Sequence, residues 1–315
     1  MRRLKVLTWQ THDSYLYYLS QAPHDFFVLS KPGGPPGYGG LGGPFPWGDN
    51  VHALPVAQLR GREFDCILFQ DARQWEKDQY AFLTPAQRAL PRIYLEHAPP
   101  RAHPTDTPHP VDDPGVLLVH VTPFNELMWN NGRTPTTVIE HGVLVPDNVR
   151  YRGELERGLV IGNGLARRGR RMGADLFLRA RAELPLDLVG TDAEELGGIG
   201  AIPHAQLPAF AAHYRFLFSP IRYASLGLAV IEAMMVGIPV VALATAEMAT
   251  VIEDGANGYS DTRFARLDEC MRELLRSPSL ARDIGQAGRR RAQERFSIER
   301  FSADWDAALR HVTGA

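Results

Sequence analysis

The chain has 315 residues, of which 44% are hydrophobic and 22% charged, and its formal net charge is −2. This length accommodates two domains of ordinary size, and the composition is typical of a globular protein with a buried core. The nearly balanced charge gives no field of one sign, which disfavours nucleic acid and acidic polymers as partners.

Three sequence features indicate in which cellular compartment the protein is located. No apolar run reaches the ~18 residues of a membrane-spanning helix, and residues 1–20 lack the apolar core of a signal peptide. Cys66 and Cys270 form no Cys-x-x-Cys pair, so we expect two buried thiols in a reducing environment. These features predict a cytoplasmic protein, with peripheral contact at the inner face of the cell membrane left open.

The first half of the chain alternates short apolar runs with helical patterns. Continuous apolar runs of this length are typical of parallel strands that are buried on both faces. We expect strands at 4–9, 26–29, 65–70, 92–95 and 116–121, and helices at 15–20, 75–82, 85–90 and from Pro123 onward. Such an alternation predicts a Rossmann-like α/β domain.

Residues 31–50 interrupt this alternation. The stretch contains eight glycines and five prolines, with Tyr38, Phe45 and Trp47 among them. Neither a helix nor a central strand tolerates that composition. Two interpretations stay open: a disordered surface loop, or a ligand-binding loop, since aromatic rings can stack on the flat faces of sugars and other ligands.

Polar residues follow the strands of this half. Because active-site residues of α/β folds gather at the carboxyl ends of strands, His97, which follows the strand at 92–95, is a candidate site residue. A histidine that only caps the strand is the alternative. His12 follows the first strand in the same way. The segment 101–114 also holds histidines, but their irregular spacing and four prolines disfavour a metal site.

A second domain begins after a polar stretch at 146–156, which we expect to be a linker. A strand at 158–161 is followed by Gly-Asn-Gly, but Arg167 occupies the third glycine position of the dinucleotide fingerprint, which disfavours a nicotinamide cofactor. The basic run at 167–171 is either a solvated charge run or a phosphate-binding loop. Its place directly after the first strand of a domain favours phosphate binding.

The most informative pattern lies between Tyr214 and Tyr259. It consists of an apolar strand, a loop, a helix and a second apolar strand at 216–218, 219–226, 227–236 and 240–243. Gly237 and Pro239 end the helix. The loop of such a βαβ unit lies at the carboxyl edge of the sheet, where ligands bind. The helix N-terminus there offers N–H groups and a positive dipole end to a phosphate.

Specific residues of this stretch carry a resemblance. They are Pro220, Leu226-Gly227-Leu228, Glu232-Ala233-Met234, Gly237-Ile238-Pro239-Val240-Val241, Glu253-Asp254-Gly255 and Asn257-Gly258. The combination resembles the donor-binding signature of the retaining GT-B glycosyltransferases of the family-4 type (glycosyl transferases group 1). One position departs from it: Ala224 stands where that family has the first Glu of its E-x7-E pair, which touches the donor sugar. The second Glu of the pair, tied to the nucleotide ribose, matches Glu232.

The resemblance implies an α/β protein with the GT-B fold: two Rossmann-like domains whose parallel sheets face a cleft, and a C-terminal helix that crosses back to the N-terminal domain. We expect the acceptor domain at 1–147 with the returning helix at 298–315, and the nucleotide-sugar donor domain at 148–297. Further helical patterns lie at 267–276 and 282–294.

The returning helix is expected from Phe301, Trp305 and Leu309, which form an apolar stripe at helical spacing. Asp304 and Asp306 flank Trp305 and spell the D-x-D metal motif of the other glycosyltransferase fold. Because Trp305 belongs to the apolar stripe, we expect this motif to be structural.

The resemblance also implies which residues form the site. It makes His97, Arg171 and Glu232 the expected catalytic residues: His97 orients the donor sugar, and arginines of the basic run neutralise the donor diphosphate. The expected donor contacts are Arg167, Arg168, Ile202, Tyr223, Ala224, Ser225, Leu226, Gly227 and Glu232. Ile202 lies near the position where family members contact the base.

Together with these residues, the resemblance implies a retaining, metal-independent hexosyltransferase that moves a sugar from UDP or GDP to an envelope glycan or a lipid-linked acceptor. Arginines and backbone N–H groups stabilise the leaving diphosphate, so neither a metal nor a cofactor beyond the nucleotide sugar is expected. A nucleotide-sugar-binding protein without turnover is the alternative that Ala224 suggests. A UDP-sugar epimerase and a nicotinamide oxidoreductase are further alternatives that the sequence favours less. The nucleotide base, the sugar, the acceptor and the oligomeric state stay open.

Overall fold

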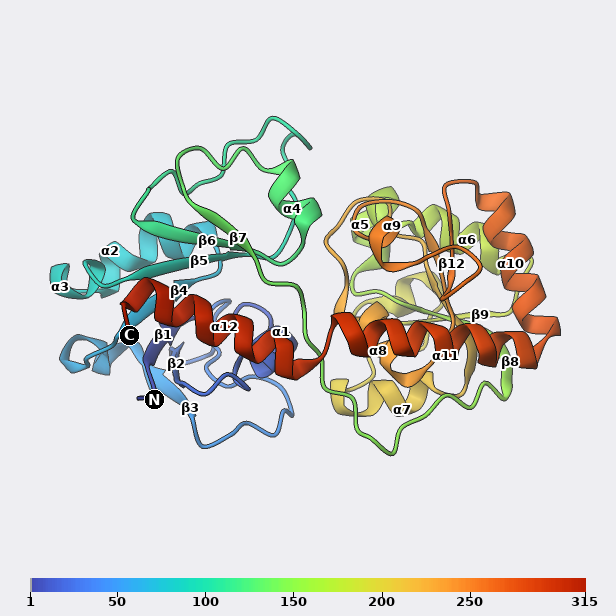
Figure 1. Cartoon of the computed structure of the whole chain (residues 1–315), viewed down its shortest axis with the longest axis horizontal. Helices are drawn as coiled ribbons and strands as arrows, with labels where there is room; N and C mark the ends of the chain where they lie inside the picture. The colour runs from blue at the N-terminus through green and yellow to red at the C-terminus, as the bar shows by residue number, and fades with distance from the viewer. Residues whose placement is uncertain (1) are drawn as a thin grey trace. The chain divides into compact units, whose positions relative to one another are not determined.

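The computed structural model describes residues 2–315. The chain divides into two compact units (Figure 1). Unit 1 comprises Met1–Gly142 together with Ile298–Ala315, and unit 2 comprises Val143–Ser297. Each unit is built on its own parallel β-sheet with helices, so the predicted α/β class is confirmed.

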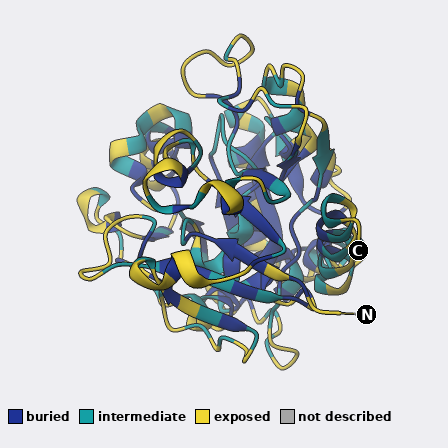
Figure 2. Cartoon of the chain, turned by 90° about the vertical axis from the view of Figure 1, so that its left-hand side faces the viewer, coloured by how far each residue is buried: buried dark blue, intermediate teal, exposed yellow. Residues whose placement is uncertain are grey.

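Unit 1 contains a seven-stranded sheet in the described part of the chain, with the order β3-β2-β1-β4-β5-β6-β7. Neighbouring strands pair in parallel. The strands are β1 (Lys5–Thr8), β2 (Asp25–Ser30), β3 (Val51–Pro55), β4 (Cys66–Phe69), β5 (Arg92–Glu96), β6 (Val116–His120) and β7 (Thr136–Val138). All four residues of β4 are buried, as expected for a strand covered on both faces. Buried strands with exposed loops at their ends are visible in Figure 2.

The first four α-helices of unit 1 are short. They are α1 (Asp13–Leu19), α2 (Gln79–Phe82), α3 (Pro85–Arg88) and α4 (Pro123–Met128). The predicted helix at 75–82 is mixed, because a π-helical turn at Gln74–Asp78 precedes α2. Thr84 begins α3 with a capping box, since its side chain accepts from Gln87 N and the Gln87 side chain accepts from Thr84 N.

The last helix, α12 (Ile298–Thr313), belongs to unit 1, as predicted. It contacts α1, β4 and β5. Phe301, Trp305 and Leu309 are fully buried on it, and Trp305 Nε1 donates to the Tyr15 hydroxyl at 3.2 Å. The flanking carboxylates bind arginines of the same helix, Asp304 with Arg300 and Asp306 with Arg310, so the D-x-D motif is structural here.

Unit 2 contains a five-stranded sheet with the order β12-β11-β10-β8-β9 among the described residues, again with parallel neighbours. Its strands are β8 (Leu155–Ile161), β9 (Leu186–Val189), β10 (Tyr214–Ser219), β11 (Val240–Leu243) and β12 (Tyr259–Asp261). Its helices are α5 (Leu165–Met172), α6 (Ala174–Arg181), α7 (Leu207–Ala211), α8 (Leu228–Val236), α9 (Met248–Val251), α10 (Phe264–Arg276) and α11 (Pro278–Arg295).

The β10–α8–β11 crossover of unit 2 follows the predicted boundaries closely. Gly237 ends α8 in the left-handed region with φ +94°, the conformation that favours glycine at a helix C-terminus. Helix α8 is buried over most of its length because apolar residues occur all around it. It packs against α11 and α7 and against the strands β10 and β11.

Candidate functional site

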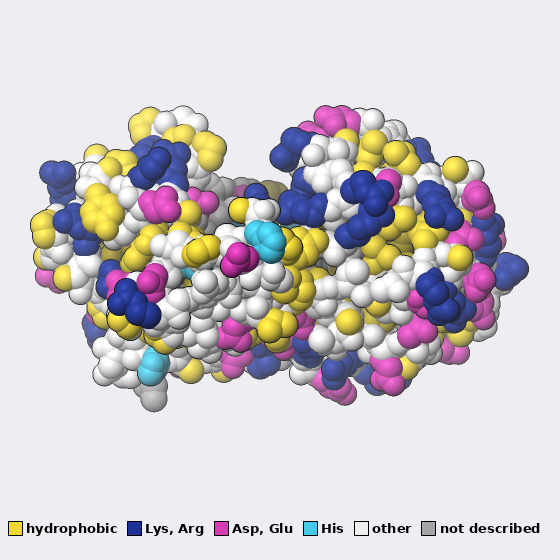
Figure 3. All heavy atoms as spheres, turned by 90° about the horizontal axis from the view of Figure 1, so that it is seen from above, with side chains coloured by type: hydrophobic (Ala, Val, Ile, Leu, Met, Phe, Trp, Pro, Cys, Tyr) yellow, Lys and Arg dark blue, Asp and Glu magenta, His cyan; other side chains and the backbone are white. Residues whose placement is uncertain are grey.

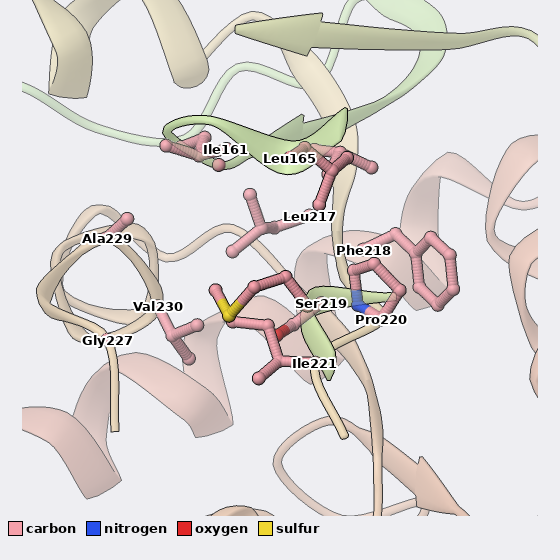
Figure 4. Close-up of a pocket in the computed structure, with 13 residues that line it drawn as sticks. Ile161, Leu165, Leu217, Phe218, Ser219, Pro220, Ile221, Gly227, Ala229 and Val230 are labelled. Carbon is pink, nitrogen blue, oxygen red and sulfur yellow. The ribbon is translucent and has the colours of Figure 1, made fainter. Parts of the chain in front are cut away.

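A crevice in unit 2 lies where the strand order of the sheet reverses. The chain leaves β8 toward β9 on one side and leaves β10 toward β11 on the other, so the loops after these two central strands separate. The pocket between them is shown in Figure 4, with Ile161 and Leu165 on one side and Ala229 and Val230 on another. Pro220, from the loop after β10, also lines it.

The start of α8 borders this pocket. Gly227 is the N-cap residue, with extended backbone angles (φ −76°, ψ 135°), and it lines the pocket together with the first turn of the helix. Glycine has no side chain to cap the helix, so the N–H groups of Leu228 and Ala229 are not bonded by the N-cap side chain. Val230 N, in contrast, donates to the Gly227 carbonyl at 3.1 Å. With the helix dipole, the N–H groups of Leu228 and Ala229 make a local binding site for an anion.

The basic run lies on α5 and is attached to the loop after β10. Gly169 breaks α5 with φ 57° and ψ −139°, and the carbonyl of Arg171 accepts hydrogen bonds from Arg222 N at 3.0 Å and Tyr223 N at 3.2 Å. Burial raises the pKa of Tyr223, whereas the nearby charge of Arg171 lowers it. Arg171 and Tyr223, both predicted as site residues, therefore lie side by side.

Arg170 and Arg222 bind a carboxylate of the protein itself. Asp175 lies 2.6 Å from Arg222 Nη1 and 2.8 Å from Arg170 Nη1. The hydrogen bond from Arg222 is the main reason that the pKa of Asp175 falls below its usual value. These pairs fix the loop after β10 on α6. Arg222 was not predicted, because its link to Asp175 spans 47 residues of sequence.

The other two predicted arginines also lie on α5. Arg167 is exposed, and its guanidinium lies over Gly164. Arg168 is half-buried, with Nη1 3.5 Å from the Asn163 carbonyl oxygen. The sphere representation in Figure 3 shows basic side chains on the surface of the right-hand half, which is unit 2.

Glu232 lies on α8 and is 4% exposed. His204 Nε2 lies 2.9 Å from its Oε1. His204 follows Ile202, the half-buried residue expected near the nucleotide base. Sequence analysis missed His204, because a single histidine in a short turn carries no pattern of its own.

A second pocket lies between the loops that follow β10 and β11. Four of the predicted donor contacts, Ala224 to Gly227, line it from one side, and residues 245–248 line it from the other. Thr245 Oγ1 donates to the Ile221 carbonyl at 2.8 Å and joins the two loops. The second loop was not predicted to form part of the site, because its proximity depends on the pairing of β10 with β11.

In unit 1, His97 lies directly after β5 and is half-buried. Its Nε2 is 3.0 Å from Gln70 Oε1, and its ring lies 4.6 Å from that of His12 and 4.9 Å from that of Tyr15. Burial, and then repulsion by His12 and His141, hold the pKa of His97 well below its usual value. The imidazole is therefore neutral near pH 7.

The glycine- and proline-rich loop at 31–50 has a packed conformation. Tyr38 is 1% exposed, and Lys31 Nζ lies 3.6 Å from the centre of its ring. Phe45 and Trp47 lie 5.3 and 5.8 Å from Tyr17 on α1, measured between ring centres. The structure therefore shows a packed loop in place of the disordered one. Binding of sugars by its aromatic rings stays a prediction.

Residues 2–315 contain no cluster of three His, Cys, Asp or Glu side chains that could hold a metal ion. Within the same residues, no helix is both long and apolar enough to cross a membrane.

Comparison with known proteins gives one family match, to the model "Glycosyl transferases group 1" over residues 193–291. No curated protein sequence matches the chain. Among solved structures, sucrose-phosphate synthase from Thermosynechococcus elongatus matches 99% of this chain and 100% of its own, with a TM-score of 0.71 and 17% identity. Anabaena HepE in complex with UDP-glucose matches 98% and 100%, with a TM-score of 0.69 and 13% identity.

Residues 193–291 match the glycosyl transferases group 1 model, and the chain as a whole has the GT-B fold of these similar structures. The expected GT-B fold is thereby confirmed, and the match of residues 193–291 to the glycosyl transferases group 1 model agrees with the expected enzyme class, a glycosyltransferase. Staphylococcus aureus TarM, in complex with fondaparinux, alpha-GlcNAc-glycerol and UDP, is a further similar structure, at 15% identity and a TM-score of 0.59 over 78% of this chain and 55% of its own. Glu232 and Ala224 lie inside the matched range of the glycosyltransferase model, whereas the basic run and His97 lie outside it.

Proposed function

We propose that the protein is a retaining, metal-independent glycosyltransferase that transfers a sugar from UDP or GDP to an envelope glycan or a lipid-linked acceptor. The observation that carries the proposal is the attachment of Arg171 to the loop after β10, through hydrogen bonds from Arg222 and Tyr223 to its carbonyl. This attachment joins the basic run to the loop that leads into α8.

The chemistry requires stabilisation of the leaving diphosphate. Departure of the nucleotide from the anomeric carbon leaves negative charge on the β-phosphate. Guanidinium groups bind phosphate oxygens strongly and in a defined direction, so Arg171, with Arg167 and Arg168, is assigned this role. The N–H groups at the start of α8 support the same charge. With these groups the chain needs no metal at the phosphate.

The remaining residues recognise the rest of the donor. Glu232 accepts hydrogen bonds from the ribose hydroxyls, with His204 fixing its carboxylate, and Ile202 contacts the base. The residues from Tyr223 to Gly227 surround the diphosphate and the sugar. His97 is assigned to orient the sugar, a role that suits a neutral imidazole held by Gln70. Retention of configuration follows if the leaving phosphate takes the acceptor's proton on the same face.

The donor class and the acceptor are supported by similar structures. HepE was crystallised with UDP and with UDP-glucose, and TarM with UDP and glycan compounds. We therefore expect UDP before GDP, and a glycan before other acceptors. A lipid-linked acceptor would place the reaction in the cytoplasm at the inner face of the membrane.

Titration with UDP, GDP and their sugar conjugates, with and without EDTA, tests the donor site. Binding that EDTA leaves unchanged, followed by slow release of free sugar with its anomeric configuration retained, supports the proposal. Binding of none of these compounds contradicts it. Binding without hydrolysis or transfer, unchanged in Ala224→Glu, supports instead a nucleotide-sugar-binding protein, which the missing carboxylate at position 224 favours.

A further inference from the structure

One carboxylate in the second pocket of unit 2 has no role in the proposed function. Glu247 lines this pocket together with Ala224. Ala224 belongs to the loop after β10, and Glu247 belongs to the loop after β11. The pocket therefore has a carboxylate at position 247, although it has none at position 224.

Glu247 is held firmly. It is 2% exposed, and Arg295 Nη2, at the end of α11, lies 2.9 Å from its Oε1. The hydroxyl of Thr250 bonds the same oxygen. Ala246, just before it, has φ +50°, a left-handed conformation that costs energy for any residue other than glycine. The turn that delivers Glu247 to the pocket is therefore strained, which is common at functional sites.

Stability alone is a poor reason for this arrangement. Removing a carboxylate and a guanidinium from water costs about as much free energy as their attraction returns, so buried ion pairs add little stability on average. A carboxylate has sites for about four hydrogen bonds. Arg295 and Thr250 both bind Oε1 and thereby fix the direction of the carboxylate. The Glu247 side chain acts as a hydrogen-bond acceptor.

The lining of the pocket indicates what it binds. Its other lining residues come from the loops after β10 and β11 and are uncharged, with the hydroxyls of Ser225 and Thr245 as the polar side chains among them. A carboxylate held by Arg295 offers hydrogen-bond acceptors to the pocket, which suit a neutral group with hydroxyl donors better than a diphosphate, whose oxygens are acceptors themselves. Of the parts of a nucleotide sugar, the ribose is assigned to Glu232, so the hydroxyl-bearing part left over is the transferred sugar.

We propose that Glu247 is a specificity-determining residue that accepts hydrogen bonds from hydroxyl groups of the donor sugar, in place of the carboxylate missing at Ala224. This inference rests on the proposed function, because it requires a nucleotide-sugar donor at this site.

The test compares a sugar conjugate with its free nucleotide. Binding of UDP-glucose, UDP-N-acetylglucosamine and GDP-mannose to the full chain identifies the tightest conjugate. Glu247→Gln is expected to weaken binding of that conjugate about tenfold or more, as for loss of a hydrogen bond to a charged group, and to leave binding of the free nucleotide within about twofold. Equal weakening of both ligands, or of neither, would overturn the inference.

Two further variants separate recognition from folding. Asp187→Asn removes the carboxylate bound by Arg157 on the strands of unit 2, outside both pockets, and is expected to leave both affinities unchanged. Ala224→Glu in the Glu247→Gln background should restore conjugate binding.

If Glu247→Gln fails to fold, Ala224→Glu alone decides the matter. A second carboxylate beside Glu247 should not strengthen conjugate binding, and a fivefold gain would overturn the inference. Wild-type protein that binds free UDP or GDP but no conjugate overturns this inference alone. Wild-type protein that binds neither nucleotides nor conjugates overturns the proposed function as well.

Discussion

His204 Nε2 and Glu232 Oε1 lie 2.9 Å apart, although 28 residues separate them in the chain. Glu232 is 4% exposed on α8, and His204 belongs to the turn that precedes α7. A buried carboxylate needs a partner that fixes its direction. The pair therefore prepares Glu232 to receive ribose hydroxyls, with His204 acting as a positioning residue.

Glu232→Gln should weaken UDP binding about tenfold, because a hydrogen bond between a hydroxyl and a charged group is replaced by a neutral one. The effect should be specific to the ribose hydroxyls. We therefore expect the variant to lose the preference of the wild type for UDP over 2′-deoxy- or 3′-deoxy-UDP in calorimetric titrations. A variant that keeps the wild-type preference contradicts the ribose assignment. His204→Gln should reduce the same preference to a smaller extent.

Arg171→Gln should weaken binding of UDP by about ten- to a hundredfold, because a charge-assisted contact to the diphosphate is lost. Uridine, which has no phosphate, should bind the variant and the wild type alike. Arg170→Gln is the matched control, since Arg170 is bound by Asp175 2.8 Å away. It should change the affinity for UDP by less than about twofold. Similar losses in both variants would mean that the run acts through general positive charge.

Gly173 and Gly169 form a pair for testing the connection between α5 and the loop after β10. Both have positive φ, +83° and +57°, but only at Gly173 would a Cβ atom collide with the backbone of Pro220. Gly169→Ala should reduce the free energy of unfolding by about 2 to 3 kcal/mol from backbone strain alone, because φ 57° with ψ −139° is a conformation that glycine alone adopts readily. Gly173→Ala should cost at least as much, because of the collision, and should also weaken UDP binding.

Urea unfolding and UDP titration of these two variants provide the measurement. Gly173→Ala with the stability and the UDP affinity of Gly169→Ala would show that the contact with Pro220 does not position the site.

His120 predicts how stability depends on pH. It is fully buried on β6, its Nε2 lies 3.0 Å from Asn131 Oδ1, and burial lowers its pKa to about 4. Below the ordinary histidine pKa of about 6.5, the unfolded chain binds a proton that the folded chain does not. Stability should therefore fall as the pH drops from 6.5 toward 4, by about 2 kcal/mol between pH 7 and pH 5.

His120→Gln should remove this part of the acid sensitivity, even if its stability at pH 7 is lower. The measurement is the difference between unfolding free energies at pH 7 and pH 5. His311→Gln, at an exposed position of α12, is the control and should keep the wild-type difference. An unchanged difference in His120→Gln would assign the acid sensitivity to other groups.

The sequence determined most of the strands, because a strand buried on both faces must be a continuous apolar run. Residues 240–243 show this: all four are buried, and the predicted and observed boundaries of β11 agree. Strands β3, β7 and β12 were missed, and each lies at an edge of its sheet. Edge strands are partly exposed, and β7 has no buried residue, so their sequences lack the apolar run.

The sequence also determined the βαβ crossover that borders the site, because its residues are close in the chain and its end signals are local. Gly237 stops α8 for a reason that concerns only its own backbone. The order of the amino acids was therefore sufficient to locate the α8 N-terminus, Glu232 and the loop at 219–226.

Only the tertiary structure decided which residues, distant in the sequence, lie against α8 and the loop at 219–226. His204 reaches Glu232, Arg222 reaches Asp175, and Glu247 shares a pocket with Ala224. Each of these contacts depends on the order of the strands and on which loops leave the sheet side by side. Strand order follows from the packing of the whole unit, and single polar residues in loops carry no periodic signal of it.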